Sequence, residues 1–389
     1  MNLFTKARLL THIARWRLTW DKRDTHYRPR NLTNPKFKSA IEAAAMIPDS
    51  AVVIGAGMGA NQRASILYWA IKERWLKEKA PKNLTWVSVG AHGGRGRVPG
   101  TMEELAYDGL ITRYIMGHVE TQKGFLKLAD AGKLELHIMA QGEMCFLLEA
   151  QGKGEDSLLS KTGLNSFCDP SFGRGTAVSK NAKENFITRE GDFLRYRLPK
   201  VNVAVFIVPY ADTEGNLYVK NAAMFTEAYD AAMAVKKNGG LVLVAVGDVI
   251  PKDPKAIFLP ADKVDAIVVN PRNEQTGSVP QRRYWKMFTE GAQVDVVEAV
   301  KELKFINNTL KITPVRKETE NAVARLAASR VVREIKRGSL INIGVGLPEE
   351  VCRLFFETGL YKDITFVTET GNVGGLPSPG IFFGAAINP

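Results

Sequence analysis

Cysteine and histidine are scarce in this chain. Its 389 residues include three cysteines and five histidines, and the spacings CxxC, HxxxH and HExxH do not occur among them. We therefore expect no metal site. Cys145 and Cys352 stand in apolar surroundings, where a cysteine more often packs as a small hydrophobic group than acts as a nucleophile.

Long apolar runs are also missing. No stretch reaches the roughly 18 residues that a membrane-spanning helix needs, and no signal-peptide core with a small-residue cleavage site is present. We expect a cytoplasmic protein without a transmembrane segment. With 45% hydrophobic and 24% charged residues, the chain is ordinary globular protein, long enough for two domains.

Lysine and arginine outnumber the acidic residues, and the formal net charge is +12. Residues 1–30 hold eight basic and two acidic side chains, which is half of that excess. The apolar residues of this arm recur at helical intervals: Leu9, Leu10, Ile13, Trp16 and Trp20. Such an arm could lie on a membrane or on RNA, but we expect a helix docked on its own protein or on another subunit. The body has no aromatic-basic RNA-binding consensus, so we expect no nucleic-acid partner.

Apolar strands alternate with helical patterns along the body. Strand-like segments lie at 51–55, 84–89, 111–116, 134–138, 201–208 and 240–247, and helix-like segments at 61–79, 119–131 and 219–237. This rhythm predicts βαβ units and a largely parallel sheet. A hinge near 312–316, which contains Pro314, precedes a helical pattern at 318–336 and a second α/β unit.

The stretch AVVIGAGMGA invites a dinucleotide-binding interpretation, which fails on two counts. Gly55, Gly57 and Gly59 give GxGxG rather than GxGxxG, and the next strand, LTWVSV, does not end in an acid that could hold a ribose. We expect no nicotinamide or flavin cofactor.

Two segments of the chain repeat. SAVVIGAG at 50–57 returns as SLINIGVG at 339–346, and LTWVSVGAHGG at 84–94 returns as ITFVTETGNVG at 364–374. Both halves therefore share a strand–turn–helix–strand–turn plan. The second pair sets Glu369 against Val89, so the architecture does not require a carboxylate there.

Glu369 ends a run of β-branched and aromatic residues, 364–367, whose composition suggests a strand covered on both faces. An acid at such a place is costly unless it is solvated, paired or used. In open α/β sheets, ligands bind beyond the carboxyl ends of the strands. Glu369 could serve there as a general base, a counter-ion or a nucleophile, and the pattern alone does not choose among them.

The chain resembles the class I (3-oxoacid type) CoA-transferases, similar to the fused-chain acetate, propionate and succinyl-CoA:3-ketoacid CoA-transferases. The resemblance runs from about residue 35 to the last residue and rests on the combination of ETGNVGGLP, NIGVGLP, AQGEMCFLLEAQGKG, CDPSFGRGT, VNVAVFIVPYADTEGN and VDAIVVNP. Relatives commonly have Glu-Ser-Gly, Glu-Asn-Gly or Glu-His-Gly where this chain has Glu-Thr-Gly.

The resemblance implies an α/β fold with two related open, largely parallel sheets. It divides the chain into a basic amphipathic arm, an α-type module, a linker and the start of a β-type module, at 1–34, 35–300, 301–317 and 318–389. Family β modules continue for roughly a hundred residues more, so the second module is expected to be truncated here and activity to need residues beyond Pro389.

By resemblance, Glu369 is the nucleophile, Gln141 is a candidate side-chain donor to the oxyanion, and the glycines near CoA are Gly344, Gly346, Gly374 and Gly375. Gln141 could instead be a surface amide at a helix start, and glycines also suit close packing of a strand and a helix. CoA is expected as substrate and covalent intermediate, with no permanently bound cofactor. Arg95 or Arg97 could face an anionic substrate or lie in a solvated loop.

The expected activity is transfer of CoA between an acyl-CoA and a free carboxylic acid, with short-chain acyl or 3-oxoacyl groups, through a ping-pong mechanism with a glutamyl-CoA thioester. The alternatives are a truncated non-catalytic paralogue that acts as a binding or assembly subunit, and an acyl-CoA hydrolase. The expected partners are the acyl-CoA and acid substrates, together with further copies in a homo-oligomer or a second chain that completes the module.

Overall fold

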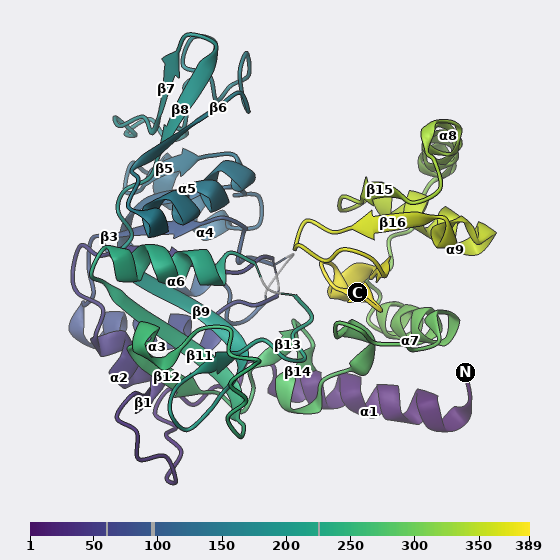
Figure 1. Ribbon diagram of the computed structural model, residues 1–389, viewed down its shortest axis with the longest axis horizontal. Coiled ribbons are helices and arrows are strands. Elements are labelled where there is room, and N and C mark those ends of the chain that lie inside the picture. The colour runs from purple at the N-terminus through teal and green to yellow at the C-terminus, as the bar shows by residue number, and fades with distance from the viewer. Residues whose placement is uncertain (60, 95–97, 225) are drawn as a thin grey trace. The chain divides into compact units, whose positions relative to one another are not determined.

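The computed structural model describes residues 1–59, 61–94, 98–224 and 226–389, and its contacts divide the chain into two compact units (Figure 1). The large unit comprises Asp21–Lys220 and Thr226–Asn273. The small unit comprises Met1–Trp20, Asn221–Phe225 and Glu274–Pro389. The first twenty residues therefore pack with the C-terminal part of the chain. The module boundaries expected at residues 34, 300 and 317 stay a prediction.

A parallel sheet forms the centre of the large unit. Its strand order is β1-β12-β11-β9-β2-β3-β4-β5, and β10 pairs antiparallel with β9. The strands are β1 (Phe37–Lys38), β2 (Val52–Gly55), β3 (Leu84–Ser88), β4 (Ile111–Met116), β5 (Glu135–Ile138), β9 (Val203–Ala211), β10 (Leu217–Tyr218), β11 (Leu241–Val249) and β12 (Ala266–Val269). Every residue of β9 is buried, as in a strand covered on both faces. The predicted α/β class is confirmed.

Helices cover both faces of this sheet. They are α2 (Ala40–Ala45), α3 (Ser65–Glu78), α4 (Lys123–Asp130), α5 (Gln141–Lys153) and α6 (Ala228–Lys237). Ile54 of β2 lies in an apolar cluster with residues of α5 and α6, whereas the adjacent Val53 lies in a second cluster with residues of α2 and α3. Because successive side chains of a strand point to opposite faces, the unit has three layers and two slabs of core.

Three helices begin later than the sequence pattern predicted. The helices expected at 61–79, 119–131 and 219–237 begin at Ser65, Lys123 and Ala228. Residues 61–64 are buried in the loop after β2 although they are not helical. Asn61, Gln62 and Arg63 are buried polar residues, and helical spacing alone did not exclude them from the helix.

A small antiparallel sheet was not predicted. It consists of β6 (Ser157–Ser160), β7 (Ile187–Glu190) and β8 (Phe193–Arg197), in the order β6-β8-β7. Most exposed side chains of these strands are polar, although Leu159 and Phe193 are exposed too, and the segments lack the long apolar runs that identified the other strands.

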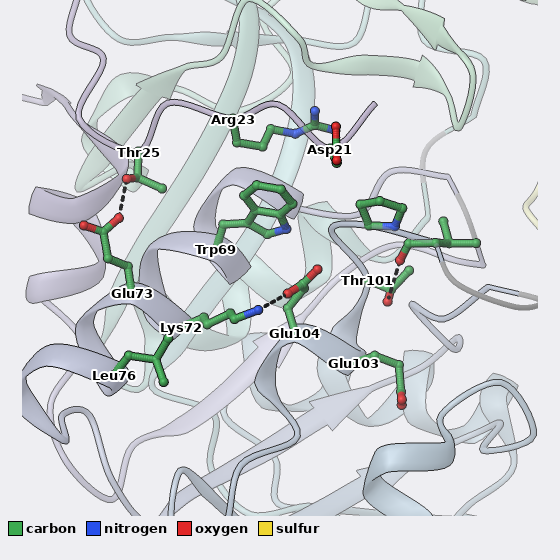
Figure 2. Close-up of a pocket in the computed structure, with 12 residues that line it drawn as sticks. Asp21, Arg23, Thr25, Trp69, Lys72, Glu73, Leu76, Thr101, Glu103 and Glu104 are labelled. Atoms are coloured by element: carbon green, nitrogen blue, oxygen red, sulfur yellow. Dashed lines mark hydrogen bonds and ion pairs between the residues drawn. The ribbon is translucent and has the colours of Figure 1, made fainter. Parts of the chain in front are cut away.

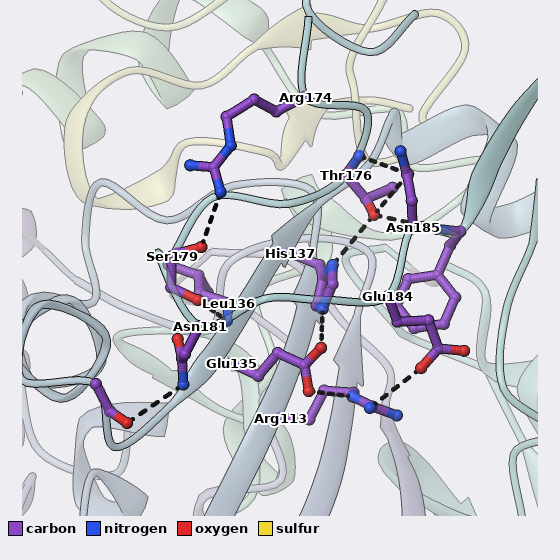
Figure 3. Close-up of polar contacts among 12 residues, drawn as sticks. Arg113, Glu135, Leu136, His137, Arg174, Thr176, Ser179, Asn181, Glu184 and Asn185 are labelled. Carbon is purple, nitrogen blue, oxygen red and sulfur yellow. Dashed lines mark hydrogen bonds and ion pairs between the residues drawn. The ribbon is translucent and has the colours of Figure 1, made fainter. Parts of the chain in front are cut away.

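Polar contacts cover the edge strand β5 of the large sheet (Figure 3). Arg113 donates to Glu135 at 2.9 Å, His137 contacts Glu135 at 3.0 Å, and the other ring nitrogen of His137 lies 3.1 Å from the Thr176 hydroxyl. The backbone N–H of Ile138 also donates to the Thr176 carbonyl at 2.8 Å. The segment around Thr176 therefore protects an edge that would otherwise expose unpaired backbone groups.

The small unit is built from helices around short strand pairs. The helices are α1 (Leu3–Thr19), α7 (Val296–Thr309), α8 (Glu318–Glu334) and α9 (Pro348–Thr358). The strands are β13 (Glu274–Thr276), β14 (Val279–Pro280), β15 (Ser339–Asn342), β16 (Ile364–Val367), β17 (Leu376–Pro377) and β18 (Ala386–Ile387). Short 3₁₀ turns in the two units lie at Met102–Leu105, Ala261–Lys263, Gln281–Arg283, Lys286–Phe288, Leu360–Lys362 and Gly380–Phe382.

Residues 301–309 of the expected linker belong to helix α7. Leu303 and Ile306 of this helix are buried in the core of the small unit. Asp295 caps the helix by accepting from the Glu298 N–H at 2.9 Å. Only the residues after Thr309, up to the start of α8, form the connection.

The predicted internal repeat has the same strand pairing in both units. β2 pairs in parallel with β3 across α3, and β15 pairs in parallel with β16 across α9. The registers differ by one residue: Val53 is opposite Trp86, whereas Asn342 is opposite Val367. The repeated plan is confirmed at the level of strand order.

Candidate active site

The carboxyl ends of β15 and β16 lie side by side in the small unit. Asn342 is paired with Val367, and the N–H of Ile343 donates to the Val367 carbonyl at 3.3 Å. Since the strands are parallel, the turn at 343–347 and the turn at 368–375 leave from the same edge. Five of the six predicted site residues, all except Gln141, therefore belong to neighbouring turns.

Glu369 occupies the tip of the turn that follows β16. The Gly371 N–H donates to the Thr368 carbonyl at 3.1 Å, and the Thr368 N–H donates to the Asn372 carbonyl at 3.0 Å. Glu369 is exposed, whereas Thr368 and Thr370 on either side are buried. The backbone thus turns sharply with the carboxylate on its solvent side.

Side chains of this turn fasten it to the rest of the small unit. The Thr368 and Thr370 hydroxyls are 2.8 Å apart, and Thr370 donates to the Gly384 carbonyl. The Asn372 amide donates to the same carbonyl at 3.0 Å and to the Ala223 carbonyl at 3.3 Å. These bonds fix the backbone position of Glu369, which is what a reacting group needs.

The expectation of a strand covered on both faces is wrong for β16. Ile364 and Phe366 are buried, but Thr365 and Val367 are only half-buried. This alternation indicates one covered face. Glu369 itself is exposed, so it does not carry the full cost of burial expected for an acid at the end of a covered strand.

The glycines of the two turns divide into two kinds. A Cβ on Gly375 would come within 2.5 Å of the Ile387 carbonyl oxygen, so packing against β18 explains this glycine. A Cβ on Gly344 would meet nothing closer than Pro348 Cγ at 3.8 Å. Neither chain packing nor a positive φ requires glycine at 344, and this leaves close approach of a ligand as a reason for it.

The turn at 343–347 leads into the N-terminus of α9. The Gly346 N–H donates to Glu349 at 3.0 Å, and the Gly346 carbonyl accepts from Arg316 at 3.0 Å. Arg316 also pairs with Glu350 at 3.1 Å. Among the described residues, no hydrogen bond uses the N–H groups of Gly344 and Val345, so these two donors are available to a ligand.

Gln141 belongs to the large unit, at the first residue of α5. The aliphatic part of the Gln141 side chain packs against Gly117. A Cβ added at Gly117 would lie 2.2 Å from Gln141 Cγ and 2.4 Å from the Val89 carbonyl oxygen. Gln141 therefore lies at the carboxyl edge of the large sheet, just beyond β3 and β4. Its half-buried amide makes no hydrogen bond with another residue in the described ranges.

Buried polar side chains form a network around the turn at Gly57 in the large unit. The sequence pattern did not predict this network. The Gly57 N–H donates to Glu227 at 3.3 Å, and the Gly57 carbonyl accepts from His92 Nε2 at 2.8 Å. Tyr68 contacts the other ring nitrogen of His92. Burial raises the pKa of Glu227 and lowers the pKa of His92 to about 4. Both groups hold Gly57 in place.

A cavity of about 610 Å³ opens elsewhere on the large unit (Figure 2). Its walls include the Lys72–Glu104 ion pair at 2.5 Å and the hydrogen bond from Thr25 to Glu73 at 2.6 Å. Arg23 lies over the Trp69 ring, 5.7 Å from its centre. No predicted site residue lines this cavity.

Some sequence-based expectations concern groups outside these turns. Arg95 and Arg97 lie outside the described residues. Cys352 is buried and Cys145 is half-buried, and burial raises the pKa of each thiol to about 12, so the structure favours the packing role. In the described ranges, no group of three or more potential side-chain ligands is placed to hold a metal, and no helix there could span a membrane.

The sequence was compared with characterised proteins. The chain is 31% identical over 360 residues to the caffeate CoA-transferase of Acetobacterium woodii and 28% identical over 363 residues to the acetate CoA-transferase YdiF of Escherichia coli (strain K12). Over about nine tenths of its length, the chain is therefore similar in sequence to named CoA-transferases. The alignments cover 91% and 90% of this chain, but the chain spans only 65% and 63% of those relatives. No family model matches it.

Solved structures agree on the fold. The crystal structure of the acyl-CoA transferase YdiF apoenzyme from Escherichia coli O157:H7 matches with a TM-score of 0.75 over 93% of this chain and 67% of that one, at 24% identity. The same enzyme crystallised as a thioester complex with CoA matches with a TM-score of 0.74, also at 24% identity, over 90% of this chain and 67% of that one. These CoA-transferase relatives therefore support the two-unit α/β architecture.

Proposed function

We propose that this chain transfers CoA between an acyl-CoA and a free carboxylic acid, with Glu369 as the nucleophile. The main support is homology to named CoA-transferases along about nine tenths of the chain. The exposed carboxylate at the tip of a fastened turn, beside a second turn with unused N–H donors, suits that role.

In the first half-reaction, a Glu369 carboxylate oxygen attacks the thioester carbonyl carbon. The C–S bond then breaks and CoA departs as the thiolate. An acyl-glutamyl anhydride remains on Glu369. The thiolate attacks the side-chain carbonyl carbon of Glu369 and expels the acyl group as a carboxylate, which leaves a glutamyl-CoA thioester. An acceptor carboxylate reverses both steps. The group-transfer energy is kept because each bond exchange replaces one activated acyl group with another.

Each attack places negative charge on a carbonyl oxygen, which needs hydrogen-bond donors fixed beforehand. The Gly344 and Val345 N–H groups are suitable on the small unit, at the edge from which the Glu369 turn also leaves. Gln141 is the side-chain candidate on the large unit. Among the glycines, Gly344 and Gly346 are proposed to lie against CoA with Gly374, whereas Gly375 has a packing role.

One alternative function has an observation in its favour. Exposure of Glu369 leaves its thioester open to water, which favours acyl-CoA hydrolysis. A non-catalytic binding or assembly subunit is the other alternative. We also propose short-chain acyl or 3-oxoacyl substrates, a cytoplasmic location, and assembly as a homo-oligomer or with a second chain.

The proposal is tested by exchange of labelled acetate into acetyl-CoA. The wild type is compared with Glu369→Gln and with Glu290→Gln, an exposed control on the same unit. We expect Glu369→Gln to lose about a thousandfold or more of the exchange rate and Glu290→Gln to keep it. Exchange retained by Glu369→Gln contradicts the nucleophile assignment. Steady release of CoA without an acceptor indicates a hydrolase, and acetyl-CoA binding with neither reaction indicates a binding subunit.

A further inference from the structure

The basic N-terminal helix α1 uses only one of its sides to pack on the small unit. Leu9 and Ile13 are buried in the same core cluster as residues of α7, and Arg8 pairs with Glu302 of α7 at 2.7 Å. The His12 ring lies 4.9 Å from the Trp285 ring. The expected docking of the helix on its own protein is therefore confirmed for this side.

The opposite side of α1 exposes large apolar side chains. Leu3 is 83% exposed, Phe4 78%, Leu10 48% and Leu18 71%. At 100° per residue these four positions fall within about 120° of the helix circumference. The positions between them are Ala7, Thr11 and Ala14. The helix thus presents a continuous apolar stripe about 25 Å long.

Basic side chains border this stripe on both edges. Lys6 and Arg17 lie along one edge, and Arg8 and Arg15 along the other. The helix contains no acidic residue. Apart from Arg8, which reaches Glu302, these cations add positive charge around the apolar stripe. Their long stems can lie along apolar material while the charged ends stay in water.

We propose that this outward face of α1 lies on an anionic lipid surface, with the helix axis parallel to the membrane. An apolar stripe bordered by Lys and Arg is the arrangement by which a helix lies in the headgroup region, and each basic residue there adds attraction to acidic lipids. The chain would bind peripherally. The proposal does not depend on the proposed enzymatic activity.

Two other occupants fit the observations less well. Nucleic acid would neutralise the cations but would leave the Leu and Phe side chains against phosphates and sugars. A second copy of the same face would cover the apolar stripe. It would also place Lys6, Arg15 and Arg17 close to the same cations of the other copy, and the helix has no acidic residue to pair with them. Acidic lipid supplies both the apolar contact and the opposite charge.

The test is sedimentation of the full chain with vesicles of phosphatidylcholine alone or mixed equally with phosphatidylglycerol. We expect binding to the mixed vesicles only, weakened by salt. Phe4→Glu with Leu18→Glu should lower binding at least tenfold, and Lys6→Gln with Arg15→Gln should do the same. The control pair Val323→Glu with Leu326→Glu, on the exposed face of α8, should bind as the wild type does.

Several outcomes would overturn the proposal. One is equal binding of the wild type to both vesicle types, and another is unchanged binding of Phe4→Glu with Leu18→Glu. If light scattering shows that this double variant dissociates an oligomer of the wild type, a second copy covers the face instead. If the wild type binds an oligonucleotide more tightly than the mixed vesicles, and the Lys6→Gln with Arg15→Gln variant loses that binding, nucleic acid is the occupant.

Discussion

The carboxyl ends of β3 and β16 occupy equivalent places in the two units, but one is buried and the other presents a carboxylate. Val89 after β3 is 3% exposed, whereas Glu369 after β16 is exposed. β3 lies between β2 and β4 in the large sheet, while β16 pairs in parallel with β15. The same local plan therefore serves packing in one unit and presents an exposed acidic residue in the other.

The two edges are also held in place by different groups. In the large unit, fully buried ionisable side chains, His92, Tyr68 and Glu227, surround the turn at Gly57. In the small unit, neutral hydroxyl and amide groups of Thr368, Thr370 and Asn372 hold the turn of Glu369. The comparison implies that the large-unit edge depends on pH.

The largest expected effect is the acid sensitivity that His92 gives to the large unit. Its folded pKa of about 4 lies below the ordinary 6.5, so the unfolded chain binds the proton first as pH falls. Stability contributed by neutral His92 is present above pH 6.5 and is lost as pH falls toward 4, by about 3 kcal/mol. Urea unfolding at several pH values should show a shallower decline for His92→Gln, which cannot take up a proton.

The matched control for this prediction is His26→Gln, because His26 is exposed. This variant should follow the wild-type curve. A His92→Gln protein whose stability declines with pH as steeply as the wild type would show that the buried network does not set the acid sensitivity.

The next effect separates the equivalent glycines Gly55 and Gly344. A Cβ on Gly55 would lie 2.9 Å from Nε1 of the fully buried Trp86, so Gly55→Ala should lower the free energy of unfolding by about 1–3 kcal/mol. Gly344→Ala should change it by less than about 0.5 kcal/mol but weaken acyl-CoA binding about tenfold. Urea unfolding and calorimetric titration measure the two effects. The comparison fails if Gly344→Ala is the less stable variant or binds normally.

The last effect is expected at Thr370, in the turn that carries Glu369. Thr370→Val removes the hydroxyl that contacts Thr368 and the Gly384 carbonyl, which should lower the free energy of unfolding by about 1 kcal/mol. The Glu369 turn should loosen, so CoA exchange should fall at least tenfold. Thr370→Ser keeps the hydroxyl and should restore the rate. Exchange at the wild-type rate in Thr370→Val would show that the hydroxyl's hydrogen bonds do not position Glu369.

The strands of the large sheet were predictable because their residues form apolar runs. β4 was placed at its observed bounds, and β2 and β3 within one residue. The strands β6, β7 and β8 were missed, since these short strands mix polar and apolar side chains and have no such run. The expected linker overlaps α7, and the helical spacing of Leu303 and Ile306 is the sequence signal of that helix.

The candidate site was predictable in part. Repetition and motif placed Glu369 beyond a strand end and close to the turn of Gly344, as the structure has them. Its exposure was not predictable, because composition cannot tell a strand with one covered face from a strand with two. The network of His92 and Glu227 joins residues 135 positions apart, and their contact depends on folding of the large unit.

Mass spectrometry of the trapped intermediate tests the central claim most directly. The wild-type chain is incubated with acyl-CoA in the absence of an acceptor acid, and the protease digest is then searched for CoA on the peptide that contains Glu369. The account predicts this adduct, its reduction by borohydride to the alcohol, and no adduct in Glu369→Gln. CoA attached to any other residue, or acyl-CoA that binds the wild type without forming an adduct, would contradict it.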